Sequence, residues 1–413
     1  MKRFHLLRPV LITAAAILLS GCIRQQSPTV VLWAHRVDVA AIVELYNAEQ
    51  RDFKIEMRHV PDPASVIDEA AVQPDIIISD AIANEEIGNY FASLGSLVDR
   101  HPIVNTVFYR ELLQSGRIDG RQRLLPLSFD LPAMIFRRGG ENENLSEFTL
   151  HFDNIRSEAA GFNASNNGRF TRMGLSPRWN QEFLYVLAAT HGAGFHENSR
   201  SAAWDEQRLL ESLDYARDWV SSDNEGVTSE NAFTNRYLYD PKYQLLMRGR
   251  IRFAYMRAGE LFGYTESQRQ RIDYRWISGD QGIPVLENIV YVGMPQNAPN
   301  RRGAQDVLEW LFQPRTHERI LESVRSKRLS EFGIAGGFSS IPTVNERYFP
   351  RYYPALLGLV PREDKLVFPQ RVPRYWKDLR AKVVEPWLQR EVSALPQPRS
   401  LREEIRLWLL QRG

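Results

Sequence analysis

Cysteine is nearly absent from this chain of 413 residues, which holds only Cys22. Without a second cysteine, the chain cannot form an internal disulfide bond or a zinc–thiolate site, and after residue 22 it has no cysteine nucleophile. A large excess of one charge is also missing, because 52 lysine and arginine residues stand against 50 aspartate and glutamate residues. This balance does not indicate a nucleic-acid partner. After residue 30, no apolar run approaches the ~18 residues of a membrane-spanning helix.

Motifs of common catalytic sites are missing too. The sequence has no G-x-S-x-G, H-E-x-x-H or G-x-x-x-x-G-K-[ST], and Gly192-Ala193-Gly194 lacks the rest of a dinucleotide-binding fingerprint. The eight histidines show no metal-ligand spacing. We therefore expect no metal, no cofactor and no enzymatic activity. A carboxylate pair for glycoside cleavage can occur at any spacing, so a carbohydrate-active enzyme is kept as the least favoured alternative.

The first 22 residues have the pattern of an export signal. Three basic residues precede an apolar run over residues 11–19, which is too short to span a bilayer as a helix. The run ends in Leu19-Ser20-Gly21-Cys22, which resembles the lipobox of bacterial lipoproteins. That resemblance implies a signal peptide over 1–21, lipidation of Cys22 and a short tether over 22–28. An ordinary secretory peptide with a spectator cysteine is the alternative.

The segment after the tether alternates strand and helix patterns. Residues 29–34 form an apolar run, helical spacing follows Asp38, and residues 53–58 alternate apolar and polar side chains. Residues 74–80 then read as a fully buried strand. Such alternation predicts an α/β lobe with a mostly parallel sheet. Because ligands bind beyond the carboxyl ends of such strands, we expect the loops at 35–38 and 79–81 to face one crevice.

Later segments indicate a second lobe. Residues 124–136 are extended and apolar but are interrupted by Pro126, Asp130 and Pro132, which predicts a kinked strand that crosses between lobes. Helical spacing marks residues 209–220, 307–320 and 401–409. Pro386 must start, kink or break the helix that begins near Tyr375.

The order of these elements resembles the extracellular solute-binding proteins of bacterial ABC importers, in the large sugar-binding family that includes maltose-binding protein. The similarity lies in the first strand and helix, a "PD plus apolar" strand, two crossings between lobes, and a return strand followed by a helix pair. The matching segments are Val30–Glu49, Pro74–Ile78, Ile87–Asp99, Asp119–Asp130, Leu245–Glu260, Asn288–Leu321 and Gly336–Pro342.

This resemblance implies a two-lobed periplasmic-binding-protein fold of type II, with a hinge between two α/β lobes. One lobe would take residues 29–128 and 286–336, and the other residues 129–285 and 337–413. The implied function is capture of a small polar solute, a sugar or oligosaccharide, and its delivery to an ABC permease. We expect a monomer held by its lipid on the periplasmic or extracellular face of a membrane.

The site residues come from the strand ends and from the resemblance. Sugars need carboxylates and amides for their hydroxyl groups and aromatic rings for their CH faces. In the second lobe, Trp179 lies in a loop before a helix, while Glu260 and Trp376 stand at positions similar to cleft contacts of the family. The expected ligand-binding residues are His35, Arg36, Asp38, Ser79, Asp80, Asp130, Trp179, Glu260 and Trp376.

Three alternatives stay open at this stage. Sugar-binding members have an aromatic residue just after the "PD plus apolar" strand, where this chain has Ser79 and Asp80. Arg36, Arg178 and Arg257 could bind a phosphate or carboxylate, so a charged solute is one alternative. A sensor or adhesin without a transport role is another. Finally, Asp38 and Asp80 could simply cap helices.

Overall fold

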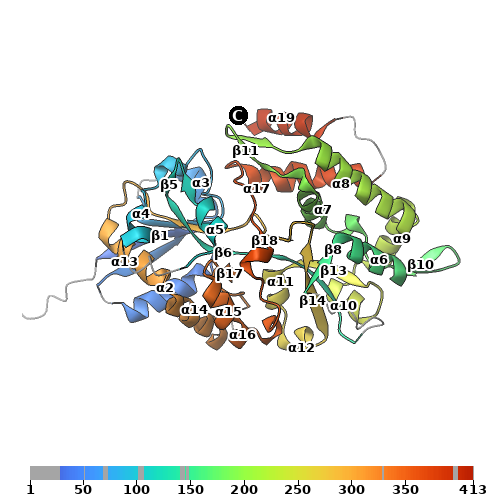
Figure 1. The fold of residues 1–413 in the computed structure, drawn as a ribbon, viewed down its shortest axis with the longest axis horizontal. Helices are drawn as coiled ribbons and strands as arrows, with labels where there is room; N and C mark the ends of the chain where they lie inside the picture. Colours follow the sequence, from blue (N-terminus) through green and yellow to red (C-terminus); the bar gives the residue numbers. More distant parts are fainter. Residues whose placement is uncertain are drawn as a thin grey trace, which may run out of the picture.

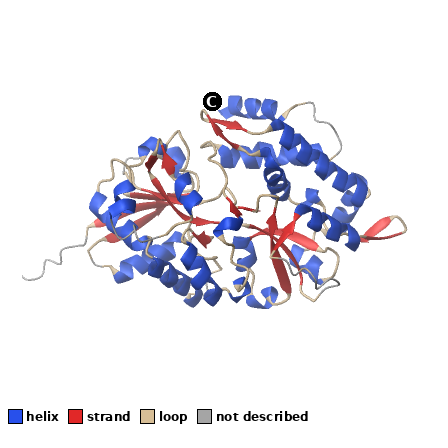
Figure 2. Ribbon diagram, in the orientation of Figure 1, coloured by secondary structure: helices blue, strands red, loops and turns tan. Residues whose placement is uncertain are grey.

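A computed structural model describes residues 28–50, 52–67, 73–100, 107–139, 145, 148–327, 330–393 and 399–412, without the side chains of 99 and 100. The predicted signal peptide, Cys22 and nearly all of the tether lie outside these residues. Two sheets, each covered by helices, build two lobes side by side (Figures 1 and 2). No helix in the described ranges is both long enough and apolar enough to cross a membrane.

Lobe 1 is the part of the chain built on a six-stranded sheet. The strand order is β17-β6-β16-β3-β1-β2, with β1 parallel to β2 and β3, and the other ladders antiparallel. The strands are β1 (Thr29–Ala34), β2 (Lys54–His59), β3 (Ile76–Ser79), β6 (Leu124–Phe129), β16 (Val290–Gly293) and β17 (Phe338–Ser339). The helices are α2 (Val39–Glu49), α3 (Pro63–Val66), α4 (Gly95–Arg100), α5 (Arg110–Ser115), α13 (Arg301–Leu311), α14 (Pro314–Ser326), α15 (Pro342–Arg347) and α16 (Phe349–Tyr352).

Lobe 2 is the part built on a four-stranded sheet of order β13-β7-β14-β8, in which only β14 and β8 run parallel. The strands are β7 (Pro132–Arg137), β8 (Thr149–His151), β13 (Phe253–Arg257) and β14 (Ile272–Ser278). The helices are α6 (Phe152–Phe162), α7 (Gln181–Ala188), α8 (Glu206–Asp218), α9 (Val227–Tyr237), α10 (Lys242–Met247), α11 (Ala258–Gly263), α12 (Glu266–Arg269), α17 (Trp376–Leu379), α18 (Glu385–Val392) and α19 (Leu401–Arg412).

Short elements complete the fold. Small two-stranded sheets pair β4 (Arg117–Ile118) with β5 (Arg121–Gln122), β9 (Ala164–Asn166) with β10 (Arg169–Arg172), β11 (His196–Asn198) with β12 (Ser201–Ala203), and β15 (Ile283–Pro284) with β18 (Leu366–Val367). Single helical turns are η1 (Gly88–Tyr90), η3 (Pro177–Trp179), η4 (Ala189–Ala193), η5 (Trp219–Asp223), η6 (Pro354–Leu356), η7 (Glu363–Lys365) and η8 (Arg380–Val384).

The predicted α/β class is confirmed, but both sheets are mixed rather than mostly parallel. The cause is the crossing of the chain between lobes. β6 leads out of the first sheet through Asp130 and Leu131 into β7, and β16 enters the same sheet from the other lobe. Strands that leave and return in this way run in opposite directions, so they pair antiparallel.

The division of the chain also differs in one segment from the one that the resemblance implies. β17 pairs with β6, and α15 and α16 pack against α14 of lobe 1. These elements lie with lobe 1, although the implied boundary assigns residues 337–413 to the second lobe. The later helices α17 and α18 lie with lobe 2, where α18 packs on α7 and α8.

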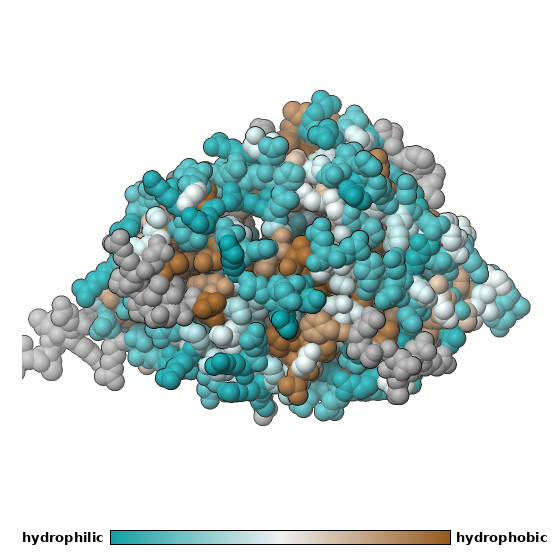
Figure 3. Space-filling model, in the orientation of Figure 1, coloured by the Kyte–Doolittle hydropathy of each residue, from teal (hydrophilic) through white to brown (hydrophobic). Residues whose placement is uncertain are grey.

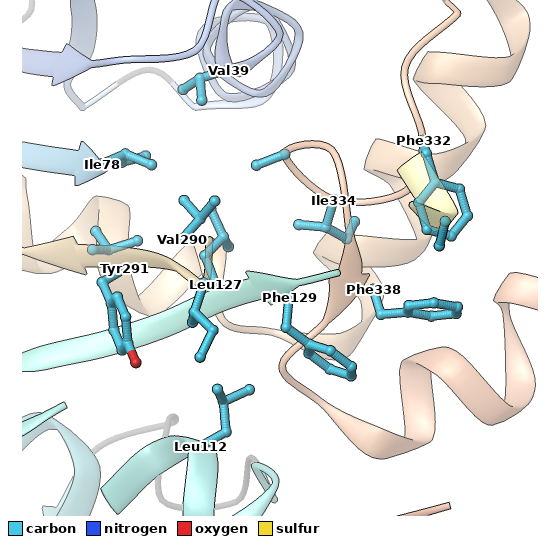
Figure 4. Packing of buried hydrophobic residues seen from close by; sticks show 14 of the residues in the cluster. Val39, Ile78, Leu112, Leu127, Phe129, Val290, Tyr291, Phe332, Ile334 and Phe338 are labelled. Atoms are coloured by element: carbon cyan, nitrogen blue, oxygen red, sulfur yellow. The ribbon is translucent and has the colours of Figure 1, made fainter. Parts of the chain in front are cut away.

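A shared apolar core joins the lobes on the side where the chain crosses. Ile78 and Val290 lie on the side of the sheet that faces Val39 of α2, and Leu127 lies on the side that faces Leu112 of α5 (Figure 4). The same cluster continues through Phe338, whose ring lies 5.7 Å from that of Trp276 in lobe 2. Burial of such large apolar surfaces stabilises this junction and leaves the opposite side of the lobes for a cleft.

Candidate functional site

A cavity of about 480 Å³ lies between the lobes, at the carboxyl ends of β1 and β3. This is the place where open α/β sheets bind ligands. Figure 3 shows a hollow near the centre of one face of the molecule, between the two lobes of Figure 1. The cavity, called the cleft below, is lined by His35, Arg36, Asp80, Ala81, Ala83, Asn84, Arg257, Glu287, Asn288, Val372, Pro373, Arg374, Trp376, Lys377, Arg380, Ala381 and Glu385.

His35 and Asp80 face each other on the lobe 1 wall. The Nδ1 of His35 donates a hydrogen bond to the carbonyl oxygen of Ile78 at 3.3 Å, because a carbonyl can only accept. Its Nε2 lies 3.5 Å from Oδ1 of Asp80. Burial lowers the pKa of His35 below its usual 6.5, despite the opposing charge of Asp80. A neutral His35 therefore turns a lone pair toward a carboxylate oxygen, and a hydrogen-bond donor is needed between them.

Arg36 reaches the cleft because the backbone around it makes room. Its guanidinium binds Asp38 through two nitrogens, at distances of 2.6 to 3.0 Å. Gly336 adopts a φ of +81°, and a Cβ there would lie only 2.2 Å from Nη2 of Arg36. Glycine is therefore required at this crossing for both its conformation and its space. Asp38 does not line the cleft, and it acts by holding Arg36.

Buried charges hold the lobe 2 wall. Glu182 accepts hydrogen bonds from Nε and Nη2 of Arg257 at 2.6 to 2.9 Å, and from Nη2 of Arg380 at 2.7 Å. Burial alone would raise the pKa of Glu182, but the hydrogen bonds and charges of the two arginines outweigh it and lower the pKa. Such charge-assisted, bidentate contacts fix the side chains in one geometry.

Arg380 is the centre of this network. Its Nη1 lies 3.4 Å from Oε2 of Glu287, its Nε donates to Glu385 at 2.8 Å, and its guanidinium lies 4.0 Å above the ring of Tyr185. Arg380 and Glu385 are five residues apart, and the π-type turn η8 between them brings both to one face. Pro386 follows this turn and lies in the first turn of α18, where a proline is tolerated.

Trp376 lines the cleft from a fixed position. Its side chain is 3 % exposed, and its indole N–H donates to Oε2 of Glu287 at 2.7 Å. The ring packs against Phe195, with 5.5 Å between the centroids. Trp376 is also the only aromatic residue among the described residues that line the cleft. Recognition in the cleft therefore depends mainly on hydrogen bonds.

Contacts between the lobes close one side of the cleft. Nζ of Lys377 donates to Oδ2 of Asp80 at 3.2 Å, and Nη1 of Arg374 donates to Glu86 at 2.7 Å. The carboxylate of Glu197, next to the turn of the β11–β12 hairpin, accepts from the backbone N–H of Glu85 at 3.0 Å. These contacts therefore join the two lobes across the cleft.

Two acceptor oxygens at the cleft are buried without a hydrogen-bond partner among the described residues. They are Oδ1 of Asp80 and Oδ1 of Asn288. The five cations that line the cleft each have a carboxylate partner instead: Arg36 with Asp38, Arg257 and Arg380 with Glu182, Arg374 with Glu86, and Lys377 with Asp80. The cleft is thus short of donors rather than of acceptors.

The structure brings some of the predicted site residues together and leaves others elsewhere. His35, Arg36, Asp80 and Trp376 line the cleft, whereas Ser79 is fully buried beside it and accepts from the backbone N–H of Ala81.

Asp130, Trp179 and Glu260 do not line the cleft. Asp130 is buried in the crossing and accepts from the N–H groups of Leu131 and Gly259. Trp179 stacks on Phe233 at 5.7 Å, and Glu260 is exposed.

Sequence reasoning missed most of the lobe 2 wall. Arg374, Lys377, Ala381 and Glu385 are spaced three or four residues apart and line the cleft together. That spacing places them on one helical face, and it was the signal available in the sequence. Glu287 and Asn288 lie in a crossing segment without such a pattern. Among the described residues, no cluster of three or more His, Cys, Asp and Glu could hold a metal ion.

No protein-family model matches the chain, and no curated protein sequence matches it. Solved structures do. The sugar-binding protein MalE from the phytopathogen Xanthomonas citri has a TM-score of 0.67 at 12% identity, over 93% of this chain and 100% of that one. The cyclic alpha-maltosyl-1,6-maltose binding protein from Arthrobacter globiformis has a TM-score of 0.62 at 16% identity, over 94% and 100%. Thiaminase I from Bacillus thiaminolyticus has 0.59 at 11%, over 89% and 100%.

These similarities establish the fold, which is that of the two-lobed MalE-like binding proteins. They cover nearly the whole of this chain and of the matched proteins. Because an enzyme shares the fold, the architecture does not by itself separate binding from catalysis. The chemistry of the cleft has to decide the function.

Proposed function

We propose that this chain is the solute-binding component of an ABC import system and that it captures an uncharged, polyhydroxylated solute, a sugar or oligosaccharide, in the cleft. The observation that carries the proposal is the shortage of donors. Asp80 and Asn288 line the cleft, each has an acceptor oxygen without a hydrogen-bond partner among the described residues, and hydroxyl groups are the donors that sugars supply. An unmet acceptor in a closed site is costly, so a ligand hydroxyl there gains affinity.

The paired cations favour a neutral solute over an anion. An anion would have to compete with the carboxylates that already hold Arg257 and Arg380. Breaking such buried pairs leaves uncompensated charges and is unfavourable. The charged solutes considered from the sequence are therefore less favoured, and the maltose-type ligand named for the Arthrobacter protein supports a carbohydrate.

Anchoring and delivery complete the proposal. Lipidation at Cys22 would hold the protein on a membrane by a short tether, beside the permease that receives the solute. Binding is reversible, with no bond made or broken. Incubation of the protein with oligosaccharides, followed by a search for products, separates this role from that of a glycoside-cleaving enzyme.

The test is a thermal-shift screen of the full chain against sugars, polyols, sugar phosphates and amino acids, followed by calorimetric titration of the best ligand. A ligand that binds only the native state raises the unfolding midpoint. We expect sugars to do so, and Asp80→Asn to weaken their binding about tenfold, because a hydrogen bond to a charged group contributes about 1.5 kcal/mol or more.

Glu260→Gln is the matched control. Glu260 is exposed and does not line the cleft, so its variant should bind as the unchanged chain does. Equal affinities for Asp80→Asn and the unchanged chain would contradict the proposed site. A response to sugar phosphates alone would contradict the neutral solute.

A further inference from the structure

Two acceptor atoms on the lobe 1 wall of the cleft face each other without a hydrogen between them. Nε2 of His35 and Oδ1 of Asp80 lie 3.5 Å apart, and their side chains are only 8% and 12% exposed. Because Nδ1 of His35 donates to the carbonyl oxygen of Ile78, the neutral ring carries its lone pair on Nε2. We call Nε2 of His35 and Oδ1 of Asp80 the acceptor pair.

The surrounding side chains leave the acceptor pair open. Oδ1 of Asp80 has no hydrogen-bond partner among the described residues, whereas Oδ2 of the same carboxylate accepts from Nζ of Lys377 at 3.2 Å. His59 donates to the backbone carbonyl of His35 rather than to its ring. A lone pair that faces a carboxylate oxygen is unfavourable, so the acceptor pair favours a ligand that brings hydrogens to both atoms.

The number of hydrogens that are needed indicates the group that binds. A single hydroxyl has one hydrogen, so it can donate to one atom of the acceptor pair but turns its own lone pairs toward the other. Two hydroxyls on adjacent carbons bring one hydrogen to each acceptor. Such hydroxyls lie side by side on a sugar ring, and the 3.5 Å between the two acceptors suits them.

A primary ammonium also carries enough hydrogens, but the surroundings disfavour a positive charge. Burial, and to a smaller extent Lys377 and Arg36, lower the pKa of His35, although Asp80 acts in the opposite direction. These are the charged groups that act on the ring of His35. An ammonium beside this ring would meet the same burial and the same two cations. A neutral diol brings its hydrogens without that cost.

Protonation of His35 removes the acceptor pair. A proton on Nε2 would point at Oδ1 of Asp80, so the imidazolium and the carboxylate would pair with each other. A diol would then meet one donor and one occupied acceptor in place of two free acceptors. Because the pKa of His35 lies below its usual 6.5, mainly through burial, the acceptor pair is available at neutral pH and is lost in acid.

We propose that the acceptor pair binds two neighbouring hydroxyl groups of the solute and that protonation of His35 releases them. This inference rests on the proposed function, because it concerns the same cleft. It narrows the solute to compounds with a vicinal diol, and it makes capture depend on pH.

Nuclear magnetic resonance of the full chain, labelled with nitrogen-15, tests the inference with three probes: cis-cyclohexane-1,2-diol, cyclohexane-1,3-diol and cyclohexylamine. The ring signals of His35 report its protonation, and backbone amide signals of the cleft give the affinity. At neutral pH we expect hydrogen on Nδ1 alone and saturable binding of the 1,2-diol. The 1,3-diol and the amine should bind about tenfold more weakly or worse.

The pH dependence gives the second readout. Affinity for the 1,2-diol should be constant above the pKa of His35 and should fall about tenfold for each pH unit below it, because one proton competes with the ligand. His35→Gln should bind about tenfold more weakly at neutral pH, since its amide can donate to Oδ1 of Asp80 at every pH. This variant keeps Asp80, so it would retain any pH dependence that comes from Asp80 itself.

His59→Gln is the matched control. His59 is exposed and contacts the backbone of His35, so this variant should keep both the affinity and the pH dependence of the unchanged chain. Thermal unfolding of each variant checks that it is folded.

Three results would overturn the inference. The first is hydrogen on Nε2 of His35 in the ligand-free chain at neutral pH. The second is no saturable binding of the 1,2-diol, or equal or tighter binding of the 1,3-diol or the amine. The third is an affinity that does not change with pH, or that changes equally in His35→Gln.

The proposed function fails in a different way. If sugars bind in the thermal-shift screen but their affinity is the same for His35→Gln at every pH, only the present inference is wrong. If the 1,2-diol binds as expected but no sugar or oligosaccharide does, the acceptor pair stands and the proposed function is wrong.

Discussion

The two walls of the cleft are held in different ways. On lobe 1, His35 and Asp80 stand on short loops after parallel strands, and their polar atoms are incompletely paired. On lobe 2, Glu182 and Arg380 belong to a buried network in which each has several partners. Polar atoms without hydrogen-bond partners contribute to affinity when a ligand pairs with them. A wall whose polar atoms are already paired instead fixes the shape of the cleft. Recognition and rigidity are thus divided between the lobes.

The largest expected effect comes from breaking the satisfied wall. Arg380→Met leaves Glu182 and Glu287 without a shared cation, and removal of one partner of a buried ion pair costs about 3–5 kcal/mol. We expect a loss of this size in the free energy of unfolding, measured by urea denaturation followed by circular dichroism.

A surface pair gives the matched control for this loss. Arg208 and Glu211 form an exposed pair, so Arg208→Met should cost no more than about 0.5 kcal/mol. If Arg380→Met and Arg208→Met lowered the free energy of unfolding by similar amounts, the lobe 2 network would not stabilise the fold as described.

Asp130, in the segment that crosses between the lobes, should make the stability of the fold depend on pH. Burial raises the pKa of Asp130 from 3.8 to about 7. Between those values the unfolded chain is ionised at this residue while the folded chain stays protonated, so stability falls as the pH rises from about 4 to about 7. At about 1.4 kcal/mol per pH unit, the loss would reach up to about 4 kcal/mol.

Asp130→Asn isolates this contribution, because the amide oxygen can still accept from the N–H groups of Leu131 and Gly259. The unfolding free energy of both proteins should be measured at several pH values between 4 and 8. We expect the free energy of unfolding of the variant to rise relative to that of the unchanged chain as the pH increases. This difference should persist above pH 7. If the free energies of unfolding of the two proteins changed with pH in the same way, the pKa of Asp130 in the folded chain would lie near its usual 3.8.

The difference between the walls also explains what could be predicted from the sequence. Strand ends of lobe 1 follow local patterns, so the buried run before Ser79 and the helix after Asp38 predicted where His35 and Asp80 would lie. The break between β6 and β7 was predictable as well, because Pro126, Asp130 and Pro132 mark it. These features can be predicted because they depend only on residues that are close together in the sequence.

The lobe 2 wall depends on contacts between distant segments. Arg380 meets Glu182 across 198 residues, and Trp376 meets Glu287 across 89. No local pattern encodes such pairs. A contact between distant segments also explains the position of Trp179 outside the cleft. Its ring stacks on Phe233 of α9. The mixed sheets follow likewise from strands that return from the other lobe.

The smallest expected effect concerns the contacts that join the walls. The side chain of Lys377 is 68% exposed where it meets Asp80, and exposed pairs contribute about 0.2–1 kcal/mol each. Arg374 and Glu86 form a second pair, in which the side chains are 23% and 43% exposed. Salt screens both. These two pairs should therefore favour the observed arrangement of the lobes only slightly. The shared apolar core keeps the lobes attached in any case.

A double variant, Arg374→Gln with Lys377→Gln, should shift the ligand-free chain toward a more open form with little loss of stability. Small-angle scattering would show this as a larger radius of gyration at low salt. At about 1 M salt, where the screening length is about 3 Å, the unchanged chain should approach the variant. If the two proteins scattered alike at low salt, closure would depend on the buried crossing rather than on these pairs, and the two walls would be joined by packing alone.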